Sequence, residues 1–202
     1  MTAGITCFDL RYPDDSHWAT WTPGDGCDAV ASELSLEVAT TSEGAALLRR
    51  SILAVNASSL EQRGAVAQNA LWVPDRSTGE PKGIVDVTII GFTKRSDATP
   101  EAFLARSWRR EHGGWRVKVT QRSTEIVQCP AGPAVVESVV GRLRRERTVQ
   151  AYSSFVIFPA DGTPEAVCLR LNTIHLDLLV ELTAHGRTIA DSLQITTGPA
   201  TP

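Results

Sequence analysis

Long apolar runs and the short motifs of the common enzyme families are both missing from this sequence. No stretch approaches the roughly 18 consecutive apolar residues of a membrane helix. The amino terminus MTAGITCFDLRYPDD has neither the basic nor the apolar region of a secretory signal. The chain contains no G-x-S-x-G, H-E-x-x-H or C-x-x-C motif. Gly24-Asp25-Gly26 and Gly113-Gly114 lack the strand before and the helix after that a nucleotide-binding loop needs. We therefore expect no membrane segment, no secretion and no bound cofactor.

Composition indicates a globular chain with a core of ordinary size. The 202 residues are 42% hydrophobic and 21% charged, which suits one domain better than two. A net charge of -3 argues against a dedicated nucleic-acid binder, whose domain would usually be basic. Without a secretory signal, the four cysteines are expected to be reduced thiols in a cytoplasmic protein. They are Cys7, Cys27, Cys129 and Cys168.

Helical and strand patterns are mixed along the chain. Ser42 is a suitable N-cap for a helix that continues to about Gly64, with Leu48, Ile52 and Val55 on its buried face. Further helices are predicted over 99–111, which the glycine pair at 113–114 would end, and over 176–193. Strands are predicted over 65–73, 84–92, 115–127, 134–140, 148–158 and 165–171. Residues 32–38 fit either a strand or the entry to a helix.

Short turns between consecutive strands favour hairpins, so the sheet is predicted to be mainly antiparallel. The fold class is therefore α+β, with about six strands and about three helices packed on them. No linker or internal repeat marks a boundary, and a single domain is predicted over residues 1–202. Within it we expect an irregular segment at 1–40, the α+β core at 41–195 and a frayed tail at 196–202.

The last third of the chain resembles a known family. In TVQAYSSFVIFPADGTPEAVCLRLNTIHLDLLVELTAHGRTIADSLQI, a strand ends at Pro159 and a second strand closes on Asn172-Thr173. A helix follows and ends in Ile189-Ala190-Asp191-Ser192-Leu193. This order is similar to that of small actinobacterial proteins of the Mog1/PsbP-like kind. The resemblance, over residues 40–195, implies an α/β/α sandwich and a binding role, because members of this superfold mostly carry no catalysis of their own.

Charge is unevenly distributed along the chain. Residues 1–43 hold eight acidic side chains against Arg11 alone, whereas residues 106–122 hold six basic side chains against Glu111 alone. The basic segment also brings arginine close to tryptophan, a combination found at protein- and anion-binding surfaces. The candidate partner-binding residues are Trp108, Arg109, Arg110, Trp115 and Arg116. The alternatives are an ordinary solvated surface, or a basic strip that neutralises the acidic segment within the molecule or a dimer.

The final predicted helix offers one constellation for a metal ion. Asp177, Glu181 and His185 lie four residues apart and would share one face of that helix. Two carboxylates and an imidazole on one face can hold a divalent ion. The alternative is a solvated polar face opposite the leucines, which is the usual outcome for an amphipathic helix. At the other end of the chain, Trp18 and Trp21 are interpreted as anchors of the amino-terminal segment rather than as an exposed patch.

The leading hypothesis from the sequence is a non-catalytic accessory protein that engages a protein partner. The partner would bind the face of the sheet, the amino-terminal segment rich in tryptophan and proline, or the arginine-rich strip around Arg109–Arg122. The alternative is a small ligand- or metal-binding protein, or an enzyme, with a pocket between helix and sheet. Nucleic-acid binding is the least favoured class, and a homo-oligomer is left open.

Overall fold

The computed structural model describes residues 3–62, 66–109, 117–143 and 148–199. Contacts within the chain distinguish two compact units. The first unit comprises Met1–Arg11 together with Ile89–Pro202, and the second comprises Tyr12–Thr88. The single domain expected over residues 1–202 stays a prediction.

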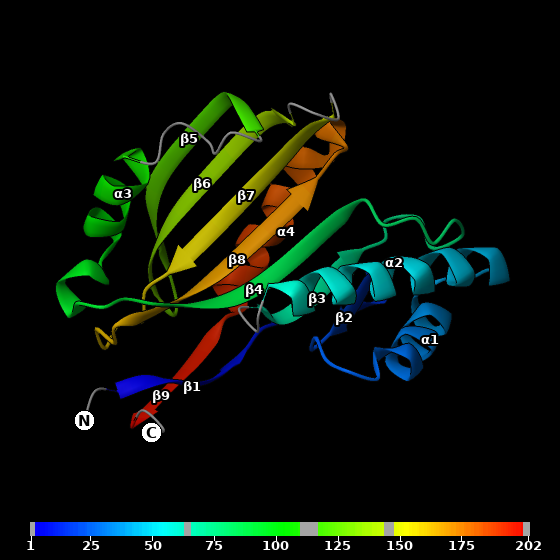
Figure 1. Ribbon diagram of the computed structural model, residues 1–202, viewed down its shortest axis with the longest axis horizontal. Helices are drawn as coiled ribbons and strands as arrows, with labels where there is room; N and C mark the ends of the chain where they lie inside the picture. The colour runs from blue at the N-terminus through cyan, green and yellow to red at the C-terminus, as the bar shows by residue number, and fades with distance from the viewer. Residues whose placement is uncertain (1–2, 63–65, 110–116, 144–147, 200–202) are drawn as a thin grey trace. The chain divides into compact units, whose positions relative to one another are not determined.

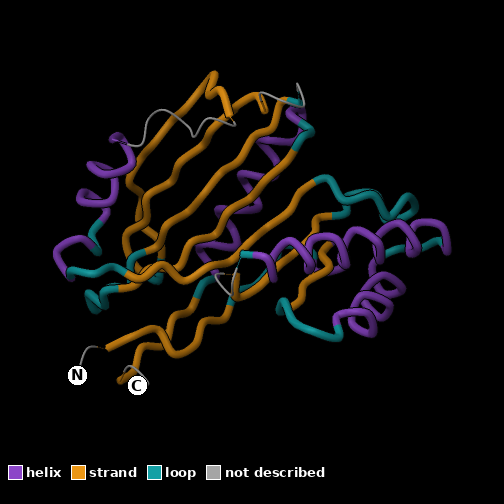
Figure 2. The backbone as a smooth tube through the Cα atoms, viewed as in Figure 1, coloured by secondary structure: helices purple, strands orange, loops and turns teal. Residues whose placement is uncertain are grey.

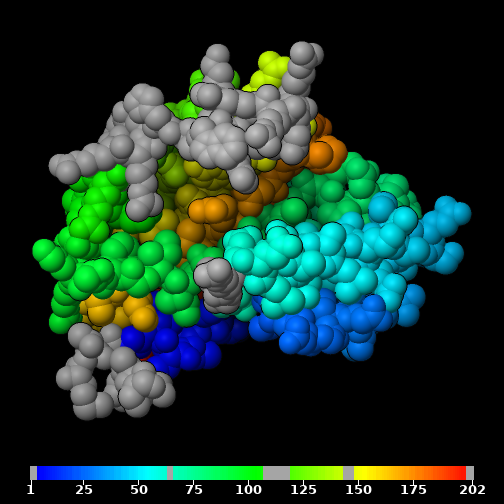
Figure 3. Space-filling model, in the orientation of Figure 1, coloured from blue at the N-terminus to red at the C-terminus, as the bar shows by residue number. Residues whose placement is uncertain are grey.

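The second unit consists of two helices and three antiparallel strands. Its strands are β2 (Trp18–Trp21), β3 (Val66–Trp72) and the part of β4 (Gly83–Gly91) up to Thr88, in the order β2-β3-β4. A 3-10 turn, η1 (Asp15–His17), precedes β2. The helices are α1 (Cys27–Val38) and α2 (Ser42–Glu61), and the outer side of α2 is in view, in cyan, in Figure 3. The hairpin predicted over 65–92 is confirmed, since β3 and β4 pair in antiparallel register.

The N-cap of α2 lies one residue before the predicted N-cap. Its N-cap is Thr41, not Ser42, because the backbone at Thr41 is extended and its hydroxyl accepts a hydrogen bond from the Gly44 amide at 3.1 Å. The helix ends at Glu61, a little before the predicted end. The buried face is the predicted one, with Leu48 and Ile52 fully enclosed.

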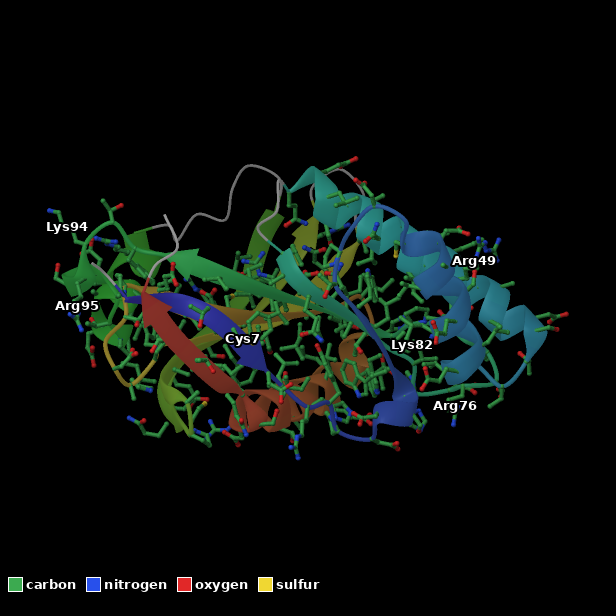
Figure 4. The ribbon with its side chains drawn as sticks, turned by 90° about the horizontal axis from the view of Figure 1, so that it is seen from below. Cys7, Arg49, Arg76, Lys82, Lys94 and Arg95 are labelled. Atoms are coloured by element: carbon green, nitrogen blue, oxygen red, sulfur yellow. The ribbon has the colours of Figure 1, made fainter. Side chains whose placement is uncertain are left out.

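Two arginines, Arg49 and Arg76 (labelled in Figure 4), form hydrogen bonds that connect other parts of the second unit to α1. The Arg76 guanidinium donates to the carbonyls of Val38 at 2.7 Å and Glu37 at 2.9 Å, which satisfies acceptors at the carboxyl end of α1. Arg49 of α2 pairs with Asp28 of α1 at 2.5 Å. The two helices therefore pack side by side over a shared apolar core.

The amino-terminal tryptophans belong to the core of the second unit. Trp18 and Trp21 are each 4% exposed. The Trp18 indole donates to the Pro13 carbonyl at 2.8 Å and stacks near Trp72, its cross-strand partner on β3. The interpretation of both tryptophans as anchors is confirmed. Residues 32–38 are helical and not a strand, but they end α1 where the alternative had them begin a helix.

Four long strands lie side by side in the first unit, in the order β8-β7-β6-β5 (Figure 1). They are β5 (Val117–Cys129), β6 (Gly132–Leu143), β7 (Val149–Ile157) and β8 (Glu165–Thr173). Each neighbouring pair is antiparallel, and the backbone tube in Figure 2 makes the meander plain. The four strands predicted over 115–171 are therefore confirmed, with shifted ends.

Helices cover both faces of these strands. Because side chains alternate along a strand, Ser153 of β7 points to one face and Ser154 to the other. Helix α4 (Leu179–Ser192), which follows a 3-10 turn, η3 (Leu176–Leu178), packs on the first face, where the Thr183 and Ser153 hydroxyls lie 2.9 Å apart. Helix α3 (Pro100–Arg109), which follows the turn η2 (Arg95–Asp97), packs on the other face through Phe103. This layering matches the predicted sandwich.

The two ends of the chain pair with each other in the first unit. Strand β1 (Ala3–Asp9) is antiparallel to β9 (Gln194–Pro199). The tail expected to fray from residue 196 is thus a strand as far as Pro199, since its backbone groups find partners on β1. The expectation of an irregular segment at 1–40 is also wrong, because that segment contains β1, β2 and α1.

The predicted fold class, α+β with a mainly antiparallel sheet, is confirmed. The described part of the chain holds nine strands: the seven from β2 to β8, where about six were expected, and the pair β1 and β9. The described part of the chain holds four α-helices where about three were expected, and the additional one is α1.

Candidate functional site

A pocket of about 440 Å³ lies on the α3 face of the first unit. Its walls come from the end of β4, from α3 and from β5 to β8. The position between helix and sheet is the one named by the alternative hypothesis from the sequence. The lining combines four charged side chains, Arg106, Arg122, Glu137 and Arg170, with an apolar floor.

A β-bulge places Arg122 in this pocket. Val119 and Arg122 both line the pocket although they are three residues apart, an odd spacing that strict alternation along β5 would send to opposite faces. The pairing of β5 with β6 shifts between Val119 and Gln121, so that Arg122 stands opposite Val139, another lining residue. The extra residue is Thr120, whose hydroxyl donates to the Val140 carbonyl at 2.9 Å.

Arg122 and Glu137 form an ion pair across β5 and β6. The Arg122 guanidinium contacts the Glu137 carboxylate through Nη2, and its Nε donates to Oε1 at 2.6 Å. Both side chains are largely shielded, with 24% and 18% of their area exposed. The pair is diagonal in the strand register, where long side chains still meet. The Tyr152 hydroxyl donates to the other oxygen of Glu137 at 3.4 Å, which is a long hydrogen bond.

Arg170 lies on β8, next to the strand that carries Tyr152. Its guanidinium lies over the Tyr152 ring, 5.9 Å from the centroid, in a cation–π arrangement. Among the described residues it makes no ion pair with a carboxylate, and its side chain is exposed. Arg106 differs, because it pairs with the largely shielded Asp97. Arg170 therefore gives the pocket a positive charge that no described carboxylate neutralises.

The phenol of Tyr152 is held in its neutral form. Burial raises the pKa of Tyr152, and the nearby Glu137 carboxylate raises it further, while Arg170 and Arg122 act in the opposite direction. A neutral phenol keeps its proton and can donate a hydrogen bond to an acceptor in the pocket.

The floor of the pocket is apolar and partly aromatic. Phe92 and Phe103 meet edge to face with their ring centroids 6.5 Å apart. They pack on a buried cluster that includes Val156 and Cys168. Cys168 is 4% exposed, so its interpretation as a small buried apolar residue is confirmed. All four cysteines lie in the described part of the chain, and none forms a disulfide with another.

The candidate partner-binding residues fall at or beyond the edge of the described chain. Trp108 and Arg109 are the last two residues of α3. Arg110, Trp115 and Arg116 lie outside the described residues. Partner binding through this strip stays a prediction.

The three candidate metal ligands do not share one helix. Asp177 lies in the turn η3, and α4 begins only at Leu179, so the four-residue spacing that predicted a common face holds for Glu181 and His185 alone. Nε2 of His185 lies 3.9 Å from Oε1 of Glu181. In the described ranges no three or more histidine, cysteine or acidic side chains are grouped so as to hold a metal ion.

Sequence reasoning missed Glu137, Tyr152 and Arg170 as members of a site. The available signal was weak: Glu137 and Arg170 are the charged residues in two largely apolar strand segments, AVVESVV and AVCLRL. A charged residue in such a strand points to a partner or a water-filled space on one face. Which face, and which partner, depends on the strand register.

No protein-family model and no curated protein matches this chain. Among solved structures it is similar to LpqN of Mycobacterium tuberculosis, described as involved in cell envelope biogenesis, with a TM-score of 0.49 and 11% identity over 94% of this chain and 83% of that one. It is also similar to the PsbP protein CyanoP of Synechocystis sp. PCC 6803, with a TM-score of 0.45 and 11% identity over 96% of this chain and 95% of that one. A protein of unknown function from Pseudomonas aeruginosa, a putative regulator by its description, gives a TM-score of 0.36 and 14% identity over 63% and 73%.

These likenesses are of the kind that the Mog1/PsbP-like resemblance implied. Identities this low and TM-scores below 0.5 give no basis for transferring a ligand, a partner or a location to this chain. The described helices include none with the length and apolar character that a membrane crossing needs. The pocket itself is therefore the basis of the proposed function.

Proposed function

We propose that this protein binds a small molecule in the pocket between α3 and strands β5 to β8. The observation that carries the proposal is the meeting of an apolar, partly aromatic floor with convergent polar groups in one concave site. The volume of about 440 Å³ lies within the range of roughly 300–1,000 Å³ that is usual for ligand sites.

The polar groups of the pocket are arranged as a binding site would need them. Arg122, Glu137, Tyr152 and Arg170 come from four successive strands, so the sheet holds them in a fixed row. The ion pair and the cation–π contact restrain their side chains before any ligand arrives. Such restraint favours binding, because less conformational entropy is lost when the complex forms.

The predicted role as an accessory protein is compatible with this proposal but does not follow from it. The candidate residues for that role lie between Trp108 and Arg116, whereas the charged residues on the strands of the pocket lie between Arg122 and Arg170. The two can be tested apart.

A neutral fluorescent probe tests the proposal. N-phenyl-1-naphthylamine brightens in apolar sites, and we expect saturable binding of one molecule per chain. Val139→Phe, which places a phenyl group inside the pocket, should weaken binding by at least about tenfold, since it fills the space the probe needs. The matched control is Gln121→Phe, which adds the same group at an exposed position of β5 outside the pocket. Absence of saturable binding, or equal binding by the two variants with unchanged far-UV circular dichroism, would show that the pocket is not a ligand site.

A further inference from the structure

We infer that the ligand of this pocket is an amphipathic anion: one carboxylate or phosphate group held between Arg170 and Arg122, and an apolar group that lies beneath α3. This inference rests on the proposed function, and it names the chemistry of the ligand.

The lining of the pocket has more positive than negative side chains. Of its three arginines, Arg106 is paired with Asp97 and Arg122 with Glu137. Arg170 is left without a carboxylate among the described residues. The lining therefore carries one positive charge that a ligand could neutralise, and charge-assisted hydrogen bonds from guanidinium to an anionic oxygen are among the strong ones in proteins.

The anionic group would lie between Arg170 and Glu137. Ser154 of β7 stands directly opposite Arg170 on β8 and directly opposite Glu137 on β6. Two strand spacings therefore separate the backbones of Arg170 and Glu137, about 9–10 Å. Ser154 has a small side chain, so it leaves room above the sheet, between Glu137 and Arg170, for the oxygens of an anionic group.

Tyr152 and Arg122 can supply hydrogen-bond donors to a group in that space. Tyr152 has a neutral hydroxyl whose hydrogen bond to Glu137 is long at 3.4 Å, so it can turn to a better acceptor at little cost. Arg122 lies on the far side of Glu137 and uses Nε and Nη2 for that carboxylate. An incoming anion would share Arg122 with Glu137, and Glu137 is thus the internal group that opposes its binding.

The register of β7 and β8 indicates where the apolar group of the ligand would lie. Val156 and Cys168 face each other across β7 and β8, two residues further along than Ser154 and Arg170. Two residues of a strand span about 7 Å. Here the floor joins Phe92 and Phe103 under α3. A ligand whose apolar group begins a few carbon atoms from its anionic group matches both ends of the pocket.

The test uses four compounds that share one apolar group: 4-phenylbutyrate, 4-phenylbutyl phosphate, 4-phenylbutan-1-ol and 4-phenylbutylamine. Binding is measured by calorimetry and by displacement of N-phenyl-1-naphthylamine. We expect at least one of the two anions to bind about tenfold or more tightly than the alcohol, and the amine to bind weakest. Preference between carboxylate and phosphate then identifies which anionic group the site takes.

Three variants make the result specific. Arg170→Gln should weaken the anion by about tenfold or more and leave the alcohol unchanged, because only the anion uses the charge. Glu137→Gln should strengthen the anion severalfold, since it removes the opposing carboxylate. Arg142→Gln is the matched control for loss of one positive charge, because Arg142 is exposed on β6 and does not line the pocket; it should change nothing beyond a small general electrostatic effect.

The outcomes separate this inference from the proposed function. If the neutral probe binds but the alcohol matches the anions, or Arg170→Gln and Arg142→Gln behave alike, the pocket binds ligands and the inference of an anion is wrong. If the neutral probe binds and none of the four compounds does, the inference is wrong as well. If the neutral probe itself does not bind, the proposed function fails and the inference fails with it.

Discussion

Replacing Gly186 by alanine tests how closely α4 packs on the sheet that carries the pocket. A Cβ added at Gly186 would lie 2.7 Å from Cε2 of Phe155 and 2.8 Å from Cδ1 of Leu171. Carbon atoms in favourable contact are about 3.5–4.0 Å apart, so the methyl group would be about 1 Å too close to each. Phe155 and Leu171 are 1% and 0% exposed, so neither can move aside into solvent.

Two effects of opposite sign decide the size of the change. Overpacking a well-filled core costs about 1–3 kcal/mol. Alanine in place of glycine inside a helix gains about 1 kcal/mol. We therefore expect Gly186→Ala to lower the free energy of unfolding by roughly 1 kcal/mol, with 2 kcal/mol as the upper end.

The assay is urea denaturation followed by far-UV circular dichroism. Ala184→Gly is the matched control, because Ala184 is exposed on the same helix and reports helix propensity alone. There, glycine should cost about 1 kcal/mol, so alanine is the better residue at 184 and the worse one at 186. Adding Leu171→Val to Gly186→Ala should recover part of the loss, because the smaller side chain relieves the overlap. A Gly186→Ala protein that is more stable than the wild type by about 1 kcal/mol would show that the close packing does not exist.

Three further substitutions test local features. Thr41→Ala should lower the free energy of unfolding by about 1 kcal/mol in urea denaturation, because α2 loses its N-cap hydroxyl, and Thr41→Ser should restore most of it. Gly132→Ala should lower the free energy of unfolding by about 1–3 kcal/mol, because Gly132 has φ +142° and an added Cβ would meet the Phe158 carbonyl. The control Gly24→Ala should be near neutral, because open space surrounds Gly24. Equal effects of the two substitutions would contradict this prediction. Tyr12→Phe should be neutral or stabilising, because the buried Tyr12 hydroxyl has no hydrogen-bond partner among the described residues. Burial raises the pKa of Tyr12 above its ordinary value near 10. The wild type should therefore lose stability as the pH rises through and beyond 10, where Tyr12 ionises in the unfolded chain, and Tyr12→Phe should lose less. Parallel stability profiles of the two proteins in urea unfolding at pH 7 to 10.5 would refute this.

Some parts of the site could be predicted from the sequence and others could not. Apolar alternation over 115–171 predicted the four strands that carry the pocket, because a half-buried strand repeats every two residues. It could not place Arg122, because the bulge at Thr120 reverses which residues of β5 face the pocket. The common helical face predicted for Asp177, Glu181 and His185 is wrong for a similar reason, since a 3-10 turn, and not the first turn of α4, holds Asp177.

Local pattern alone therefore determined the class of the fold. Hydrophobic periodicity, turn residues and helix caps act over a few residues, and they sufficed to predict α+β structure, antiparallel hairpins and most of the strand and helix positions. Pairing over long sequence distances was decided only in the tertiary structure. It joins β1 to β9, and it turns a tail that looked frayed into a strand.

The site in the pocket was also decided only in the tertiary structure. Arg122, Glu137, Tyr152 and Arg170 are spread over 49 residues of sequence, from 122 to 170, and the strand register alone brings them into one row. Composition shows that the chain holds these charges, but it does not show that one arginine faces a space in which no described carboxylate reaches it. The sequence determined the elements, and the register of the sheet decided the site, because a shift of one residue sends a side chain to the opposite face.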